Sequence, residues 1–297
     1  MSGARILVDR HIVDRIDPGD RGLAYGDGVF ETLRMHAGRP IWWDAHWTRL
    51  SRGARRLGIP LPNETMVRRQ VDALVAGQHN RDASKIGVLK LMLTRGAGSR
   101  GYGPPDHPQP TLILSLHAAP MPTPLQGIRL SWCDTRLAIQ PALAGIKHCN
   151  RLEQVLACAE FRDAMADGSP TTAEPASDHR IHEGLMRDTE GFAVCATAAN
   201  LFVLREGRWF TPPVDRCGVE GICRSWILAH AGAVESRLTV AEVESADAVF
   251  LCNSVRGILP VAALGDQRWL PHPRTSQLQR MLADAEACFG PCDGDTI

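Results

Sequence analysis

Lysine is rare in this chain, and one lysine stands where an amine could do covalent chemistry. Lysine and arginine together number 33, yet only Lys85, Lys90 and Lys147 are lysines. Arginine stays charged, whereas a lysine can form a Schiff base with an aldehyde and can afterwards act as a base. Lys147 follows the apolar run 143–146, which can desolvate its amine and lower its pKa. These features make Lys147 the best candidate for a covalent amine, with a solvated loop lysine as the alternative.

The residues after Lys147 predict a helix that would hold it in place. Asn150 can cap this helix, with Glu153 in the capping-box position. An apolar stripe at helical spacing follows, formed by Leu152, Val155, Leu156 and Ala159. We therefore expect Lys147 at a strand end or turn directly before a helix that ends near Gly168.

The other two lysines fall in a different setting. The segment 85–94 alternates as a strand does, with Lys85 at its start and Lys90 inside it. No helix cap follows either lysine. Lys90 is expected at a sheet edge or at an interface.

Several segments could bind an anion. Asp44 can cap a helix that carries Arg49, whose guanidinium fork matches phosphate oxygens. The glycine-rich turn 217–224 opens another helix, whose first amides could cradle a phosphate. The loop 94–105 holds four glycines with Arg95 and Arg100, and it could fold over an anionic ligand. Each segment has a plainer interpretation as well, as a solvated arginine or a simple turn.

Composition excludes several classes of protein. Formal net charge is zero and no basic block occurs, so nothing indicates a nucleic-acid partner. No apolar run approaches the length that spans a membrane, and the N-terminus carries charges where a signal peptide needs apolar residues. The nine cysteines are odd in number and form no CxxC pair. We expect free thiols in a reducing cytoplasm, and no metal site.

The chain divides best at a proline-rich stretch. Residues 119–124 contain three prolines, which predict a semi-rigid linker over 120–126 between domains at 1–119 and 127–297. The polar segment 169–182 is expected to be a mobile insertion. Strands are expected at 6–9, 11–16, 29–35, 85–94, 111–117, 127–132, 208–213 and 248–252. A strand–turn–strand is expected over 192–204, and the last helix near 277–288.

Taken in order, these segments resemble the fold type IV pyridoxal-phosphate enzymes over almost the whole chain. That fold is an α+β, D-amino acid aminotransferase-like architecture, with a small N-terminal α/β domain and a larger C-terminal pseudo-barrel domain. Within it, the closest resemblance is to the 4-amino-4-deoxychorismate lyases. Three segments carry this narrower resemblance, at 26–30, 95–102 and 143–155.

The resemblance implies a cofactor, a site and a partner. The cofactor would be pyridoxal 5'-phosphate, held covalently by Lys147 at an active site between the two domains. Its remaining ligands would be Arg49, Cys195, Asn200, Ile222, Cys223, Asn253 and Ser254. The substrate would be a small molecule bound by Arg100, Arg95 and Phe30. Members of the family form homodimers, in which loops of one copy help to close the site of the other.

One position departs from the family pattern. The family places a glutamate five residues before the asparagine of its Asn-Leu-Phe segment, where it binds the pyridine nitrogen. Here that position is Cys195, and a thiol is a weak hydrogen-bond acceptor. The cofactor would then be a weaker electron sink. Two alternatives to a lyase stay open: an aminotransferase of the same fold for D-amino or branched-chain amino acids, and a protein that binds the cofactor without turnover.

Overall fold

The computed structural model describes residues 4–8, 11–77, 86–98, 100–119, 126–166 and 181–290. The chain forms two compact units. The first comprises Met1–Met121 with Ile146–Asn150, and the second comprises Pro122–Gly145 with Arg151–Ile297. Residues 120–125 of the predicted linker and 169–180 of the predicted insertion lie outside the described residues. Within the described ranges, no helix is long and apolar enough to cross a membrane.

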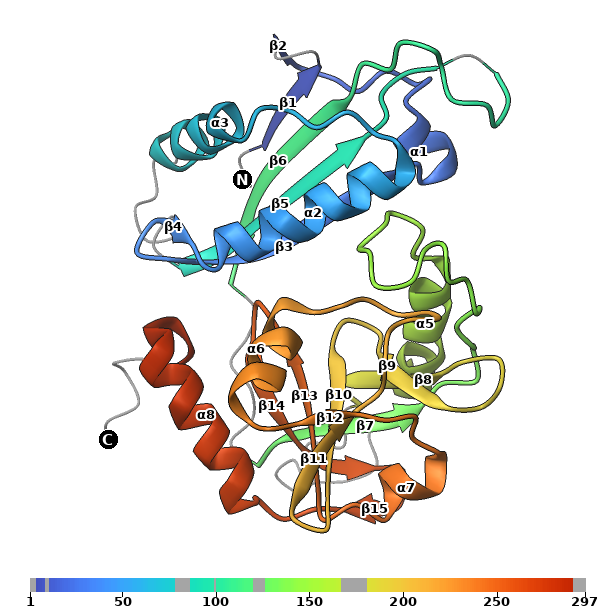
Figure 1. Cartoon of the computed structure of the whole chain (residues 1–297), viewed down its shortest axis with the longest axis vertical. Helices are drawn as coiled ribbons and strands as arrows, with labels where there is room; N and C mark the ends of the chain where they lie inside the picture. The colour runs from blue at the N-terminus through green and yellow to red at the C-terminus, as the bar shows by residue number, and fades with distance from the viewer. Residues whose placement is uncertain are drawn as a thin grey trace. The chain divides into compact units, whose positions relative to one another are not determined.

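The first unit is built on an antiparallel sheet of six strands (Figure 1). The order is β2-β1-β6-β5-β3-β4. The strands are β1 (Ala4–Val8), β2 (His11–Val13), β3 (Gly28–His36), β4 (Arg39–Pro40), β5 (Ile86–Thr94) and β6 (Thr111–Ala118). Lys90 therefore lies in a central strand, because β5 pairs with β3 on one side and β6 on the other. The expectation of a sheet edge for Lys90 is wrong.

Three helices belong to this unit: α1 (Arg21–Tyr25), α2 (Trp43–Leu57) and α3 (Glu64–Ala76). Helix α2 follows β3 along one face of the sheet (Figure 1). The predicted cap of α2 is wrong by two residues. The N-cap is Trp42, in a left-handed conformation without a side-chain cap, and Asp44 lies in the first turn. The carboxylate of Asp44 still favours the helix there, because that end of the dipole is positive.

Strand alternation divides the sheet into two different faces. The face toward the helices is almost fully buried, and its core includes Val29, Leu33, Leu89, Leu91, Leu93, Leu112, Leu114 and Leu116. Residues of opposite parity, such as Phe30, Thr32, Lys90 and Ser115, are only partly buried. One face thus makes the core, and the other is left for polar and aromatic side chains.

The second unit is a nine-stranded sheet that closes on itself. Its path is β12-β11-β10-β13-β14-β7-β8-β9, with β15 paired to β14. The strands are β7 (Ile128–Trp132), β8 (Glu183–Arg187), β9 (Ala193–Ala196), β10 (Asn200–Arg205), β11 (Arg208–Thr211), β12 (Val234–Glu235), β13 (Ala248–Asn253), β14 (Gly257–Leu264) and β15 (Gln267–Arg268). Because β9 also pairs with β10, the strands from β10 round to β9 form a closed ring. The predicted pseudo-barrel is confirmed.

Helices of the second unit are α5 (Leu152–Ala166), α6 (Ile222–His230), α7 (Val240–Glu244) and α8 (Pro273–Ala285), followed by the 3-10 turn η1 (Ala287–Phe289). The last helix begins four residues earlier than expected, because His272 caps it and Pro273 starts it. The predicted capping box of α5 does not form. Asn150 donates to Gly26 O, and Glu153 accepts from the amide of Ala138.

Candidate functional site

Lys147 is fixed to the first unit by backbone pairing. Its carbonyl accepts from the amide of Phe30 at 2.9 Å, and the amide of Cys149 donates to Gly28 O at 2.9 Å. Val29 and His148 form an antiparallel bridge between these bonds. The segment Ile146–Asn150 therefore lies beside the start of β3 like a short extra strand. The Lys147 Nζ lies 4.5 Å from the centroid of the Phe30 ring. The structure thus brings together two of the predicted site residues.

A buried charge cluster lies on the helix side of the same strand. Glu31 of β3 is 1% exposed, and its carboxylate accepts from Arg49 Nε at 2.8 Å and from Arg49 Nη2 at 2.5 Å. Nδ1 of His46 lies 2.6 Å from the same carboxylate. His46 and Arg49 are one turn apart on α2, so both reach Glu31.

The protonation states of this cluster follow from its contacts. Burial alone would raise the pKa of Glu31, but the Arg49 charge and the hydrogen bonds from Arg49 and His46 lower it to about 2. Burial lowers the pKa of His46, against the opposing effect of Glu31. Glu31 is thus an anion paired with Arg49, and His46 is neutral at physiological pH. Sequence analysis missed Glu31, although a carboxylate at a core position of an alternating strand was a usable signal.

Arg95 and Arg100 of the glycine-rich loop have different environments. Arg95 is buried, donates twice to Asp27, and donates to the carbonyls of Leu57 and Gly58. These contacts give Arg95 a structural role, because most of its N–H groups are engaged within the unit. Arg21 anchors the loop from the other side, with bonds to three carbonyls of residues 101–103. Arg100 is exposed, so its guanidinium is the more accessible of the two.

In the second unit, the start of α6 forms an open cradle. Gly221 is the N-cap, and no side chain caps the first turn, which begins with Ile222 and Cys223. Asn200 Nδ2 donates to Val219 O at 3.0 Å, and a Cβ at Gly221 would lie 2.0 Å from Asn200 Oδ1. Only glycine fits beside that amide. Backbone N–H groups at such a helix start are suited to phosphate oxygens.

The turn after β13 is tied to the turn before β10. Asn253 Oδ1 accepts from the amides of Val255 and Arg256 at 3.0 and 2.8 Å. Its Nδ2 donates to Ala198 O at 3.3 Å. Ser254 lies in the turn and is 9% exposed. Asn253 therefore orders both turns. Asn200 and Asn253 of the predicted set lie at the ends of the adjacent strands β10 and β13, and Ser254 follows directly in the turn.

Cys195 lies in β9, opposite Asn200 of β10. It is buried, and burial raises the pKa of its thiol to about 12. The group at this position is therefore neutral at physiological pH, and it cannot supply the negative charge that a glutamate would.

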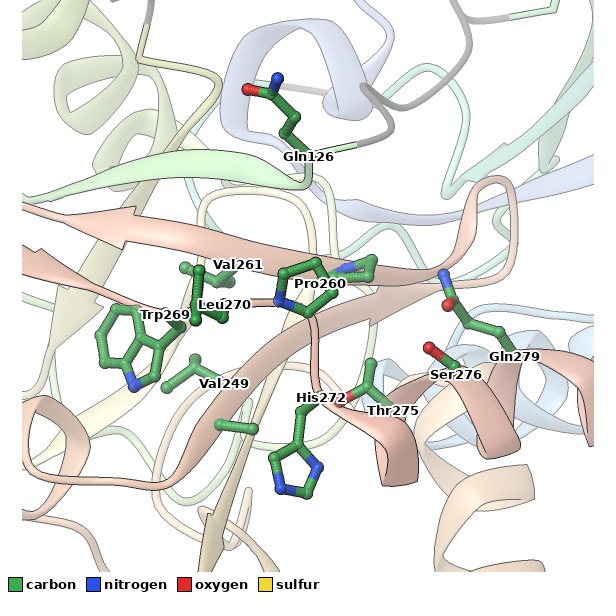
Figure 2. A pocket seen from close by; sticks show the side chains of 12 residues that line it. Gln126, Val249, Pro260, Val261, Trp269, Leu270, His272, Thr275, Ser276 and Gln279 are labelled. Carbon is green, nitrogen blue, oxygen red and sulfur yellow. The ribbon is translucent and has the colours of Figure 1, made fainter.

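Other features of the second unit stand apart from these residues. One is a cavity of about 240 Å³. Its lining includes Trp269, Leu270, His272 and Thr275 (Figure 2). None of the predicted site residues lines it. In the part of the chain that the structure describes, no group of three or more His, Cys, Asp or Glu side chains could hold a metal ion.

Comparison with known proteins agrees with this architecture. A crystal structure of 4-amino-4-deoxychorismate lyase from Pseudomonas aeruginosa is 42% identical, with a TM-score of 0.79, over 94% of this chain and 98% of that one. The two units thus define a fold type IV enzyme. The profile of the family described as Amino-transferase class IV matches residues 28–264, so the chain belongs to that family.

Two relatives of known annotation show the range within the family. The aminodeoxychorismate lyase of Vibrio harveyi is 32% identical over 83% of this chain and 86% of its own length. The D-alanine aminotransferase of Bacillus licheniformis is 27% identical over 95% of this chain and 96% of its own length. The chain is therefore similar both to lyases and to aminotransferases, and the two lyases named here are more identical to it than this aminotransferase is.

Proposed function

We propose that the protein is a pyridoxal-phosphate-dependent lyase that converts 4-amino-4-deoxychorismate to 4-aminobenzoate and pyruvate, a step in folate biosynthesis. The observation that carries this proposal is Lys147, a rare lysine whose carbonyl accepts from the amide of Phe30 beside β3 and whose amine lies over the Phe30 ring. The 42% identity to a lyase of known structure supports the choice within the family.

The residues present fit the proposed cofactor. Its phosphate would be held by the first-turn amides of Ile222 and Cys223, where Gly221 leaves room, and by Ser254 of the same unit. Arg49 would add a guanidinium. Glu31 already compensates the charge of Arg49. This guanidinium would therefore contribute less to phosphate binding than an arginine without a carboxylate partner.

Lys147 would hold the cofactor and later move a proton. When bound, pyridoxal phosphate supplies an electron sink for a carbanion at the amine-bearing carbon. The Lys147 amine is a suitable base for the proton on that ring carbon, since an amine freed from a covalent bond can accept it. Loss of the enolpyruvyl group, released as pyruvate, then leaves an aromatic ring.

Cys195 favours a lyase over an aminotransferase. The neutral thiol gives the pyridine nitrogen no anionic partner, so the electron sink is weakened. Aromatisation supplies a driving force of its own to the elimination, whereas transamination depends more fully on the sink. The second candidate function is a D-amino acid or branched-chain aminotransferase, which the similarity to D-alanine aminotransferase supports.

Incubation of the purified protein with 4-amino-4-deoxychorismate tests the proposal. We expect pyruvate and 4-aminobenzoate in equal amounts, and neither product with Lys147→Ala. Borohydride reduction of the holoenzyme, followed by peptide mass spectrometry, should place the cofactor on Lys147. Faster transamination of D-alanine than formation of 4-aminobenzoate would contradict the proposal and favour the aminotransferase.

We also propose that the protein works as a cytoplasmic homodimer. Support for the homodimer comes from α5, where the predicted apolar stripe is exposed. Leu152 is 76% exposed, Val155 60% and Leu156 59%. Contiguous apolar side chains on a surface favour association. Sedimentation of the purified protein at micromolar concentration measures the state directly.

A further inference from the structure

Lys90 is an unusual residue for its position. It lies in the middle of β5, with Thr32 of β3 opposite it on one side and Ser115 of β6 on the other. A central strand seldom carries a charged side chain without a counter-charge. Among the residues that the structure describes, Lys90 makes no ion pair, and its recorded contact is with the Phe30 ring. Ser115 shares its hydroxyl with His117 Nε2, at 2.8 Å.

Phe30 links this ammonium group to that of Lys147. The Lys90 Nζ lies 5.6 Å from the Phe30 ring centroid, and the Lys147 Nζ lies 4.5 Å from it. The two ammonium groups cannot be farther apart than the sum of these distances, about 10 Å. All three residues belong to the first unit. Two of the chain's three lysines therefore converge on one aromatic ring.

The proposed substrate has charges at a matching spacing. In 4-amino-4-deoxychorismate and in 4-aminobenzoate, the ring carboxylate lies across one six-membered ring from the amine. The amine must approach Lys147, because that residue would carry the cofactor. A cation within about 10 Å of the Lys147 amine, and beside an aromatic surface, is placed to meet the carboxylate.

We propose that Lys90 is a substrate-binding residue whose ammonium group pairs with the ring carboxylate of the substrate, while Phe30 packs against the ring. The proposal rests on the proposed function for the identity of the substrate. It gives Lys90 the role that sequence analysis assigned to Arg95, whose guanidinium is engaged with Asp27 and two carbonyls. It also gives a reason for lysine at position 90, since a single compact ammonium fits beside Phe30.

Equilibrium binding of two ligands to the holoenzyme tests the proposal without turnover. The ligands are 4-aminobenzoate and aniline, which differ by the carboxylate. We expect Lys90→Gln to weaken 4-aminobenzoate about 10- to 100-fold, the usual effect of losing a charge-assisted hydrogen bond, and to leave aniline unchanged. Lys90→Arg should restore part of the affinity. Arg69→Gln is the matched control, because it removes an exposed positive charge of α3 in the same unit.

Kinetics with 4-amino-4-deoxychorismate separates this inference from the proposed function. We expect a raised KM for Lys90→Gln, with the absorbance of the bound cofactor unchanged. The role of Lys90 would be overturned if Lys90→Gln weakened the binding of 4-aminobenzoate and aniline equally, or changed the binding of neither. This holds even if wild-type protein forms 4-aminobenzoate. If wild-type protein forms no product but binds 4-aminobenzoate through Lys90, the carboxylate site stands and the proposed reaction fails.

Discussion

Replacing Glu31 by glutamine should destabilise the first unit severely. The substitution keeps the shape of the side chain. It removes the negative charge of the carboxylate that contacts both Arg49 and His46. Arg49 is 6% exposed, and this buried guanidinium would lose the carboxylate that accepts from its Nε and Nη2 groups. Removing one partner of a buried ion pair typically costs about 3–5 kcal/mol.

The lowered pKa of Glu31, which arises from the same contacts with Arg49 and His46, gives a similar magnitude. It falls from its usual 4.5 to about 2 on folding, and each pKa unit corresponds to about 1.4 kcal/mol, so the charged form contributes about 3 kcal/mol. Because the folded pKa is the lower one, this contribution is fully present above pH 4.5. It is lost as the pH falls from 4.5 toward 2. Wild-type protein should therefore lose its advantage over Glu31→Gln across that range.

Thermal unfolding of the cofactor-free protein measures the effect. We expect the Tm of Glu31→Gln to lie roughly 10 °C below that of wild type at pH 7. The expected loss of stability is about 3 kcal/mol, and each kcal/mol lowers the Tm of a protein of this size by about 2–4 °C. Asp14→Asn is the matched control, since Asp14 pairs with Arg15 at the surface of the same unit and should change little. Arg49→Met in the Glu31→Gln background should recover part of the loss. A Tm within 2 °C of wild type, or strictly additive effects of the two substitutions, would refute the reasoning.

Two further substitutions test the second unit. Gly221→Ala should weaken pyridoxal phosphate binding at least about 10-fold, because the new Cβ collides with Asn200 Oδ1 at the start of α6. Gly103→Ala is the control, because a Cβ there meets nothing within 4 Å. Equal cofactor affinity of the two variants would contradict the role of the α6 amides. Cys195→Glu should keep lyase activity and raise transamination of D-alanine, because a carboxylate can hold the pyridine proton that the neutral thiol cannot. The assay is pyruvate formation from D-alanine with a keto-acid acceptor, and an unchanged rate would count against the role given to Cys195.

The sequence alone determined the features that depend on local pattern. Alternation over 85–94 predicted β5, and the scarcity of lysine directed attention to Lys147. The glycine-rich turn at 217–224 predicted a helix start, which the structure places at Ile222. These succeed because strand alternation and turn chemistry act between residues close in the chain.

Only the tertiary structure decided which distant groups meet. It paired Glu31 with His46 and Arg49, and it engaged Arg95 with Asp27 instead of leaving it free for a ligand. It also returned Ile146–Asn150 to the first unit and set Lys90 and Lys147 over the same ring. Such contacts join residues 15 or more positions apart. They depend on strand order and helix placement, which no local pattern specifies.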